Sequence, residues 1–366
     1  MEIVPEEASC SVEQVSRDGD ALEISGSTAL SAHTTLRVGG PAQRFVVART
    51  ERELIDEISA ADAAGVPVLV LGGGSNVLVS DEGFPGVVVR VALTRIDADV
   101  SACGGAVVRV GAGENWDDFV AYTVEQEWGG AEALSGIPGS VGATPIQNVG
   151  AYGVEVEQLV YSVRTYDRQT GQARTFAAVD CGFAYRSSLF KREPGRYVVL
   201  SVTFQLTLAS LSAPIRYAEL ARELGVEQGR RADARAVRET VLRIRGRKGM
   251  VLDDADHDTW SAGSFFTNPI LSADDAGRLP ADAPRFPTAD GRVKTSAAWL
   301  IQHAGFERGH RVGEASLSTK HVLALTNRGR ASADDIVALA REVRDGVQRA
   351  FGVTLVPEVN LVGVTL

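Results

Sequence analysis

The amino-acid sequence predicts an α+β protein with two lobes, and two observations lead to this fold class. Strand patterns are dense between residues 155 and 207, where two apolar runs flank a turn at Gln169-Thr170-Gly171. Beyond Leu211 the pattern changes to amphipathic helices with charged faces. The chain of 366 residues is long enough for two or three domains. We expect a mobile tail over 1–30, a larger α+β domain over 31–212, a smaller α+β domain over 213–350, and a terminal strand over 351–366 that returns to the larger domain.

Local signals define the elements of the first lobe. Residues 1–30 alternate acidic, serine and glycine positions without sustained apolar periodicity, which is typical of a mobile tail. Thr50-Glu51-Arg52-Glu53 is a capping box that opens a helix, and Gly65 ends this helix before a strand at Val66–Leu71. Asn115 likewise caps a second helix.

The second lobe is expected to contain two amphipathic helices. One spans Arg235–Arg245, and the other begins at Ser332 and carries an apolar stripe. Gly352 ends the second helix, and Val353–Val356 is expected to resume as a strand. Because this strand crosses back to the first lobe, it places Glu358 at the interface between the lobes, where ligand clefts commonly form.

Three glycine-rich turns indicate a cofactor that contains phosphate. Residues 136–153 include five glycines and two prolines, so their backbone N–H groups can be aimed at phosphate without side chains in the way. The Gly72-Gly73-Gly74-Ser75-Asn76 turn lies between two apolar runs, which predicts a strand, an anion-binding loop and a strand. That turn lacks the lysine of a P-loop, and Gly111-Ala112-Gly113 lacks the last glycine of a dinucleotide fingerprint. Ordinary consecutive turns are the alternative for any single segment, but three together predict a large cofactor held by several loops.

Composition and charge exclude several classes of function. The net charge of −10 at pH 7 leaves no basic footprint for nucleic acid or an anionic membrane. Cys10, Cys103 and Cys181 are far apart and odd in number, which argues against a disulfide framework and fits a reducing cytoplasm. The sequence has neither a membrane-spanning apolar run nor a signal-peptide pattern, and its histidines lack metal-ligand spacing. We expect a soluble cytoplasmic monomer that binds no metal.

Six motifs in a fixed order carry a resemblance to a known family. They are Gly72–Asn76, Gly111–Trp116, the 136–153 segment, Phe183–Phe190, Gly263–Pro269 and Pro357–Val359. Together they resemble UDP-N-acetylenolpyruvoylglucosamine reductase, from about Thr34 to the C-terminus. The resemblance implies a two-subdomain FAD-binding domain of the type shared with vanillyl-alcohol-oxidase-like flavoenzymes, followed by a substrate-binding domain. It also implies an enzyme of peptidoglycan synthesis, in which hydride passes from NADPH through FAD to the enolpyruvyl ether of a UDP-sugar and yields UDP-N-acetylmuramate.

The same resemblance assigns roles to individual residues. Hydride addition to an enolpyruvyl group creates negative charge, which a cation must stabilise before an acid protonates the carbon. By resemblance, Arg186 is the cation, Ser264 is the proton donor and Glu358 assists at the enolate. The residues implied to bind FAD without a covalent link are Gly72, Gly73, Gly74, Ser75, Asn76, Gly136, Gly139, Ser140, Gly142, Ala143, Asn148 and Gly150. Those implied to bind the substrate are Tyr152, Tyr185, Tyr217, Lys248 and Asn268, with Tyr217 in the loop that closes over the UDP end in one family subtype.

Two positions differ from the family pattern, and two other functions are compatible with parts of the sequence. His321 stands where other members can carry glutamine, and Asn360 replaces an arginine that some relatives have. Another FAD-dependent oxidoreductase, such as an alcohol or lactone oxidase, would show a His or Cys tether in the glycine loops, which contain neither. A non-catalytic flavin or UDP-sugar binder would lack Ser264, Arg186 or Glu358, and all three are present. Taken singly, Ser264 is more typical of a helix N-cap or of a loop hydroxyl bonded to backbone, Arg186 could be part of a structural ion pair, and Glu358 could equally be a surface carboxylate.

Overall fold

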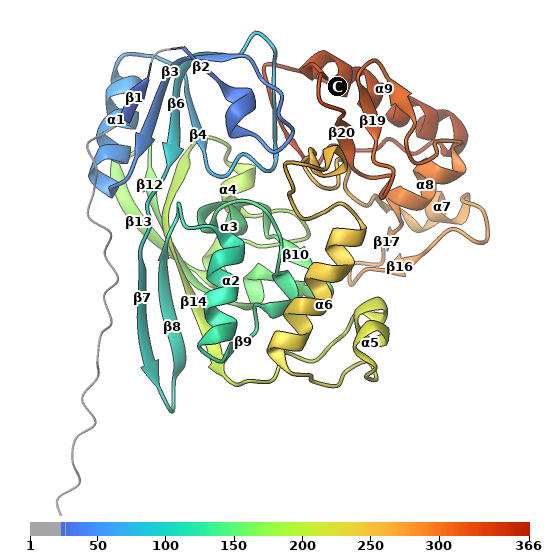
Figure 1. Ribbon diagram of the computed structural model, residues 1–366, viewed down its shortest axis with the longest axis horizontal. Coiled ribbons are helices and arrows are strands. Elements are labelled where there is room, and N and C mark those ends of the chain that lie inside the picture. The colour runs from blue at the N-terminus through green and yellow to red at the C-terminus, as the bar shows by residue number, and fades with distance from the viewer. Residues whose placement is uncertain (1–22, 26) are drawn as a thin grey trace, which may run out of the picture.

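The computed structural model describes residues 23–25 and 27–366, which form two lobes side by side (Figure 1). Within these residues, the first lobe contains a five-stranded sheet, a six-stranded sheet and a two-stranded hairpin, and the second contains three helices with two small three-stranded sheets. A further two-stranded sheet includes the last strand of the chain. The predicted α+β class is therefore present in both lobes. Helices α5 and α6 lie below the junction of the lobes in Figure 1.

The first sheet of the first lobe has the strand order β1-β3-β6-β4, with β2 also paired to β3. Strands β3, β6 and β4 run parallel, whereas β1 and β2 are antiparallel to β3. Helix α1 begins at the predicted capping box, in which Thr50 and Glu53 exchange hydrogen bonds with each other's backbone N–H. The elements are β1 (Glu23–Ser25), β2 (Thr28–Ala29), β3 (Pro41–Ala48), α1 (Glu51–Ala63), β4 (Val68–Leu71), β5 (Val77–Val79) and β6 (Phe84–Val91).

The second sheet is antiparallel and has the order β13-β12-β14-β8-β7, with β9 paired to β14. Helix α2 begins at Asn115, whose side chain accepts from two backbone N–H groups, as the sequence predicts. The elements are β7 (Ile96–Ser101), β8 (Gly105–Gly111), α2 (Trp116–Glu125), β9 (Trp128–Gly129), α3 (Thr144–Gln147), β10 (Gly150–Ala151), β11 (Val154–Glu155), β12 (Val160–Asp167), β13 (Gln172–Ala177), α4 (Leu189–Arg192) and β14 (Tyr197–Leu208).

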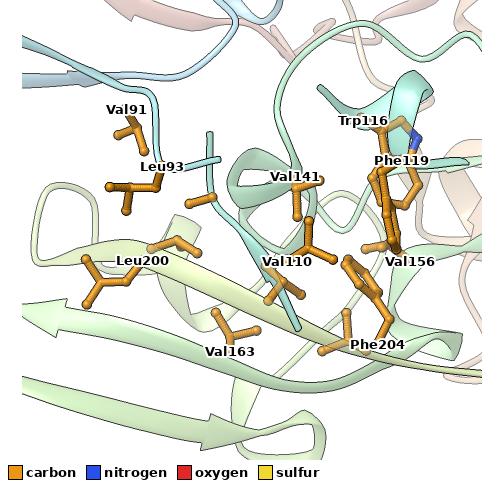
Figure 2. Packing of buried hydrophobic residues seen from close by; sticks show 14 of the residues in the cluster. Val91, Leu93, Val110, Trp116, Phe119, Val141, Val156, Val163, Leu200 and Phe204 are labelled. Carbon is orange, nitrogen blue, oxygen red and sulfur yellow. The ribbon is translucent and has the colours of Figure 1, made fainter. Parts of the chain in front are cut away.

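The core of the first lobe joins both sheets to helices α1 and α2. Figure 2 shows part of it, where Trp116 and Phe119 of α2 lie against Phe204 of β14. Val141, from the predicted glycine segment, is fully buried in the same core. This core fixes one end of each glycine loop to rigid elements, so the loops themselves are held in place.

The second lobe packs helices α8 and α9 around small antiparallel sheets. Ser332 caps α9 and Gly352 ends it in the left-handed conformation, both as predicted. The elements are β15 (Ile270–Leu271), α7 (Ala273–Gly277), β16 (Phe286–Pro287), β17 (Val293–Lys294), α8 (Ala297–His303), β18 (Arg311–Val312), β19 (Ala315–Leu317), β20 (Leu325–Asn327), α9 (Ala333–Phe351) and β21 (Asn360–Val362).

Helices α5 (Ala218–Leu224) and α6 (Ala234–Arg247) have a small core of their own. Helix α6 also packs against α2, where Arg238 donates two hydrogen bonds to the Asp117 carboxylate at 2.6 and 2.9 Å. The pair is therefore attached to the first lobe as well as to the segment that follows. The assignment of residues 213–350 to one substrate-binding domain stays a prediction.

Two details differ from the sequence-based expectations. The Val353–Val356 segment is not a strand, although alternate residues are buried. Among the described residues, its one backbone hydrogen bond to a distant part of the chain is from Thr267 N to Val356 O at 3.0 Å, and the next residue, Pro357, forms an isolated bridge with Phe266. The returning strand is β21, which pairs parallel to β5. The tail prediction falls largely on residues 1–22 and 26, which lie outside the described residues. In the described part, strands β1 and β2 pair with β3, because edge pairing uses backbone groups and needs no apolar periodicity.

Candidate active site

The two glycine loops predicted to bind the cofactor press directly against each other. A Cβ at Gly72 would lie 2.4 Å from Ser140 Oγ, and one at Gly73 would lie 2.8 Å from Gly139 Cα. Ser75 Oγ donates to Pro138 O at 2.9 Å, which ties the loops together. Glycine is therefore required here because one loop backbone approaches the other, a contact that no reading of either loop alone could predict.

Several N–H groups at this crossing are free to bind an anion. Within the described part of the chain, no backbone or side-chain acceptor receives the N–H of Gly73, Gly74 or Ser75, or those of Gly139 and Ser140. Consecutive backbone N–H groups in tight turns form concave sites for phosphate. The crossing therefore fits a pyrophosphate-bearing cofactor.

In three other residues predicted to bind the cofactor, the backbone N–H already donates a hydrogen bond within the protein. Gly136 N donates to Asp117 Oδ1 at 2.6 Å, Gly142 N to Ala112 O at 2.9 Å and Ala143 N to Ser140 O at 3.0 Å. These three residues support the loop through their N–H groups. A contact between any of them and the cofactor stays a prediction.

Asn148 and Arg186 both adopt the left-handed backbone conformation, with φ of 45° and 51°. The Asn148 side chain is fully buried, donating to Ala184 O at 3.0 Å and accepting from Glu157 N at 3.2 Å. Arg186 donates in turn to Asn148 O at 3.2 Å and Gly150 O at 2.7 Å. Asn148 and Gly150 therefore hold the arginine, and any cofactor contact they make would come from groups other than these.

Arg186 and Glu358, each predicted separately to act at the enolate, form an ion pair in the structure. Arg186 Nε lies 3.0 Å from Glu358 Oε1, and both side chains are about four-fifths buried, with exposures of 20% and 17%. The same oxygen accepts from Gln147 Nε2 at 2.9 Å, and the Gln147 amide oxygen accepts from Lys191 Nζ at 2.5 Å. Gln147 and Lys191 are not among the site residues predicted from the sequence, although Gln147 lies within the glycine-rich 136–153 segment.

The backbone brings Ser264 and the Gly72–Asn76 loop to the same place. Glu358 N donates to Phe265 O at 2.8 Å, so Ser264 precedes a residue bonded directly to Glu358. Gly263, with φ of 70°, sets the turn that leaves Ser264 half-buried. Asn76 Nδ2 donates to Glu358 O at 3.2 Å, which joins the cofactor loop to the catalytic segment.

A cavity of about 690 Å³ opens beside this cluster, lined among others by Tyr185, Arg186, Lys191 and Asn268. Burial raises the pKa of Tyr185, and the nearby charge of Arg186 opposes this shift. Asn268 Oδ1 accepts from Ala297 N at 2.9 Å, so its amide caps helix α8. Two predicted substrate residues, Tyr185 and Asn268, thus share this cavity with Arg186.

The other predicted substrate residues gather at α5 and the end of α6. Tyr152 and Tyr217 meet edge to face, with ring centroids 5.5 Å apart, and burial raises the pKa of Tyr152 to about 12. Lys248 Nζ lies 2.6 Å from Glu219 Oε2, so this lysine has a carboxylate partner without substrate. Tyr217 is 44% exposed and precedes the first residue of α5.

His321 and Asn360 have different surroundings. Burial, followed by the charges of Lys248 and Arg308, lowers the pKa of His321 to about 4. Its Nδ1 accepts from Leu323 N at 3.1 Å, so the neutral ring carries its proton on Nε2. Asn360 donates to Asn76 O from both its backbone N and its side chain, at 3.1 and 3.0 Å. These two hydrogen bonds attach β21 to the Gly72–Asn76 loop.

Within residues 23–25 and 27–366, no group of three or more His, Cys, Asp or Glu side chains could bind a metal ion. None of the helices in this part of the chain is both long and apolar enough to cross a membrane.

Comparison with known proteins defines the class. A model described as "FAD binding domain" matches residues 42–177, which include β3 to β13 and both glycine loops. A second model, "UDP-N-acetylenolpyruvoylglucosamine reductase, C-terminal domain", matches residues 254–362. The chain is therefore an FAD-binding oxidoreductase, and the free N–H groups at the loop crossing fit that cofactor.

The chain belongs to the UDP-N-acetylenolpyruvoylglucosamine reductase family. It is 61% identical to the protein of that name from Cutibacterium acnes over 92% of this chain and 90% of the relative. It is 55% identical to the Streptomyces coelicolor protein, with coverages of 92% and 90%. The crystal structure of the Thermus caldophilus reductase matches with a TM-score of 0.63 at 26% identity, covering 93% of this chain and 99% of that one. The predicted family and fold class are confirmed.

Proposed function

We propose that this protein reduces UDP-N-acetylglucosamine enolpyruvate to UDP-N-acetylmuramate with NADPH as the reductant, a step in the synthesis of peptidoglycan precursors. The observation that carries the proposal is the cluster of Arg186, Glu358 and the Ser264 segment beside the glycine loops, in a chain 61% identical to a protein named for this reduction. When bound, FAD accepts hydride from NADPH and passes it to the enolpyruvyl double bond.

Arg186 is proposed to bind the carboxylate of the enolpyruvyl group. Its three contacts to Asn148 O, Gly150 O and Glu358 engage each guanidinium nitrogen once. One N–H on each of Nη1 and Nη2 therefore remains for a ligand, which is the number that a carboxylate needs for two parallel hydrogen bonds. The positive charge stabilises the electron density that reaches this carboxylate as hydride adds.

Ser264 is proposed to protonate the carbon next to that carboxylate. A serine hydroxyl is a weak acid, but it is opposed here by a strongly basic enolate in a site partly shielded from water. The turn at Gly263 and the hydrogen bonds of Phe265 to Leu323 and Glu358 hold the Ser264 backbone on both sides. Glu358, anchored by Arg186, is proposed to assist in the same proton transfer.

The UDP part of the substrate is proposed to bind over α5 and the end of α6. Tyr217 lies on the surface at the start of a short helix, which suits a lid, and this supports assignment to the subtype with the tyrosine loop. Lys248 and Asn268 would bind the diphosphate, and the side chains of Tyr152 and Tyr185 would lie against the sugar. Lys248 must exchange its carboxylate partner for the diphosphate as the substrate enters.

We also propose that FAD is bound without a covalent link and that the protein is a cytoplasmic monomer without a metal. Neither glycine loop contains a histidine or cysteine that could form a tether. Cys103 and Cys181 are free thiols, as expected in a reducing compartment. Gel filtration and release of FAD by heat without proteolysis test these points, and flavin retained on the precipitated chain would contradict them.

Anaerobic spectroscopy tests the proposed reaction. NADPH is expected to bleach the flavin absorption, and UDP-N-acetylglucosamine enolpyruvate is expected to restore it with formation of UDP-N-acetylmuramate, identified by mass. An oxidase on the same scaffold would instead be reduced by an alcohol and reoxidised by oxygen. Reduced flavin that persists in the presence of the enolpyruvyl substrate would exclude the proposed function.

A further inference from the structure

The Glu358 carboxylate is the end of a hydrogen-bonded chain that begins outside the predicted catalytic residues. Lys191 Nζ donates to Gln147 Oε1 at 2.5 Å, and Gln147 Nε2 donates to Glu358 Oε1 at 2.9 Å. Lys191 lies at the end of α4, and Gln147 is the last residue of α3. These two short helices are fastened together by Ser188 Oγ, which donates to Ile146 O at 2.8 Å.

The chain has a direction that follows from the chemistry of its members. An ammonium group can only donate, so Lys191 requires the oxygen of the Gln147 amide to face it. The amide NH2 group must then face Glu358, and it too can only donate. Glu358 Oε1 consequently accepts a hydrogen bond from Gln147 Nε2 and lies 3.0 Å from Arg186 Nε in an ion pair, so this oxygen faces two groups that cannot accept a proton from it.

We propose that Lys191 and Gln147 are positioning residues for the Glu358 carboxylate, which they orient so that Oε2 is the oxygen that exchanges a proton in the reaction. The inference rests on the proposed function, because it gives a task to Glu358 in that reaction. Lys191 acts through Gln147 and touches neither Glu358 nor Ser264 by any hydrogen bond in the described chain. Without its ammonium group, the Gln147 amide can rotate by a half turn and present its oxygen to a carboxylate oxygen, which is repulsive.

Burial strengthens this orientation. Gln147 is 9% exposed and Glu358 17% exposed, so water cannot readily replace a lost donor. Burial also lowers the pKa of Lys191, against the opposing effect of the nearby Glu358 charge. A hydrogen bond to a charged group in such surroundings is worth about 10- to 100-fold in an equilibrium or rate.

Separate measurement of the two half-reactions tests the proposal. Lys191→Met and Gln147→Met are each expected to slow reoxidation of reduced flavin by saturating UDP-N-acetylglucosamine enolpyruvate by about 10- to 100-fold. Flavin reduction by NADPH and substrate affinity, measured by flavin-fluorescence titration of the oxidised enzyme, are expected to change less than about twofold. Lys191→Arg is expected to recover most of the rate, because a guanidinium is also a donor only.

Arg192→Met is the matched control. It removes one cation from the same helix, where Arg192 donates to Gly182 O at 2.9 Å and to Ser187 Oγ at 3.3 Å but has no hydrogen bond to Gln147, and it is expected to keep wild-type kinetics. If Lys191→Met weakened substrate binding but left the rate of flavin reoxidation at saturating substrate unchanged, Lys191 would be a substrate ligand and the inference would be wrong. Wild-type rates in both Met variants would also overturn it, whereas a wild-type enzyme that the substrate cannot reoxidise would instead overturn the proposed function. Should one Met variant fail to fold, the other decides the question.

Discussion

At the residue scale, Ser264 has a position that its sequence neighbours alone do not explain. Gly263 turns the chain before it, and Phe265 is bonded to both Leu323 and Glu358 after it. A helix cap, the ordinary alternative for such a serine, is excluded because no helix begins at Phe265. The hydroxyl is therefore carried by an irregular segment that is nonetheless fixed on both sides.

Ser264→Ala is expected to separate the two halves of the reaction. Loss of the hydroxyl should slow reoxidation of the flavin by the enolpyruvyl substrate by about 10²- to 10⁴-fold, the usual effect of removing a positioned acid. Reduction by NADPH needs no proton from Ser264 and should stay nearly unchanged. Stopped-flow absorbance gives both rates, and equal slowing of the two would show that Ser264 shapes the site instead.

His321 makes stability sensitive to acid in a defined range. The pKa of His321 is about 4 in the folded protein, against an ordinary value of 6.5 in the unfolded chain. Between these two pH values the unfolded chain therefore binds one more proton than the folded protein. Stability therefore falls as pH decreases from 6.5 toward 4. By pH 4.5 the contribution amounts to about 2 kcal/mol, since one pKa unit corresponds to about 1.4 kcal/mol.

His321→Gln is expected to remove this sensitivity. Urea unfolding of wild type and variant at pH 7.5 and pH 4.5 gives four free energies of unfolding, and their double difference isolates the histidine from the carboxylates that titrate in both proteins. The variant should lose about 2 kcal/mol less than wild type on acidification. The same loss in both proteins would mean that His321 titrates near its ordinary pKa.

At the element scale, helices α5 and α6 share a small core, and one of the ion pairs between these segments joins Glu219 to Lys248. Both side chains are partly exposed, at 26% and 32%, so the pair adds little to stability. If the substrate diphosphate binds Lys248, it must displace Glu219.

Glu219→Gln is consequently expected to tighten binding of the UDP-sugar by up to about fivefold, the value of a partly exposed ion pair of at most about 1 kcal/mol. Lys248→Met should weaken binding in either background. Flavin-fluorescence titration measures both, with flavin reduction by NADPH as the unchanged reference. Unchanged or weaker binding in Glu219→Gln would show that Glu219 does not compete with the substrate.

Elements with local signals could be predicted from the sequence, and those that depend on distant partners could not. The caps at Thr50, Asn115 and Ser332 act within one turn, and each appears as predicted. The Val353–Val356 segment has strand-like alternation but lacks a neighbouring strand to continue a ladder. Gln147 lies 211 positions from Glu358 along the chain, so its contact needed the tertiary fold.

At the scale of the whole molecule, the two lobes share residues rather than merely touching. Leu36, Val38 and Leu78 come from the first part of the chain but belong to the core of the second lobe. Asn327 Nδ2 donates to Leu36 O and Arg37 O, both at 3.2 Å. On the other side, β21 completes the pairing of β5 next to the Gly72–Asn76 loop.

This sharing predicts that both lobes unfold in one transition. Neither lobe can lose its structure without exposing core residues that it shares with the other, so their unfolding is coupled. The tryptophans offer reporters for both lobes, because Trp116 is fully buried in the first core and Trp299 packs against the second.

Two double variants make the test. Trp260→Phe with Trp299→Phe leaves only the reporters Trp116 and Trp128, and Trp116→Phe with Trp128→Phe leaves only the other two. Because the variants differ in stability, each is followed by tryptophan fluorescence and by far-ultraviolet circular dichroism, and within each variant the two urea midpoints should coincide. Excess FAD should raise the midpoint of both, since a ligand that binds only the folded state stabilises all that unfolds with its site. A second-lobe reporter whose midpoint ignores FAD would show that the lobes unfold separately and that the shared residues do not couple them.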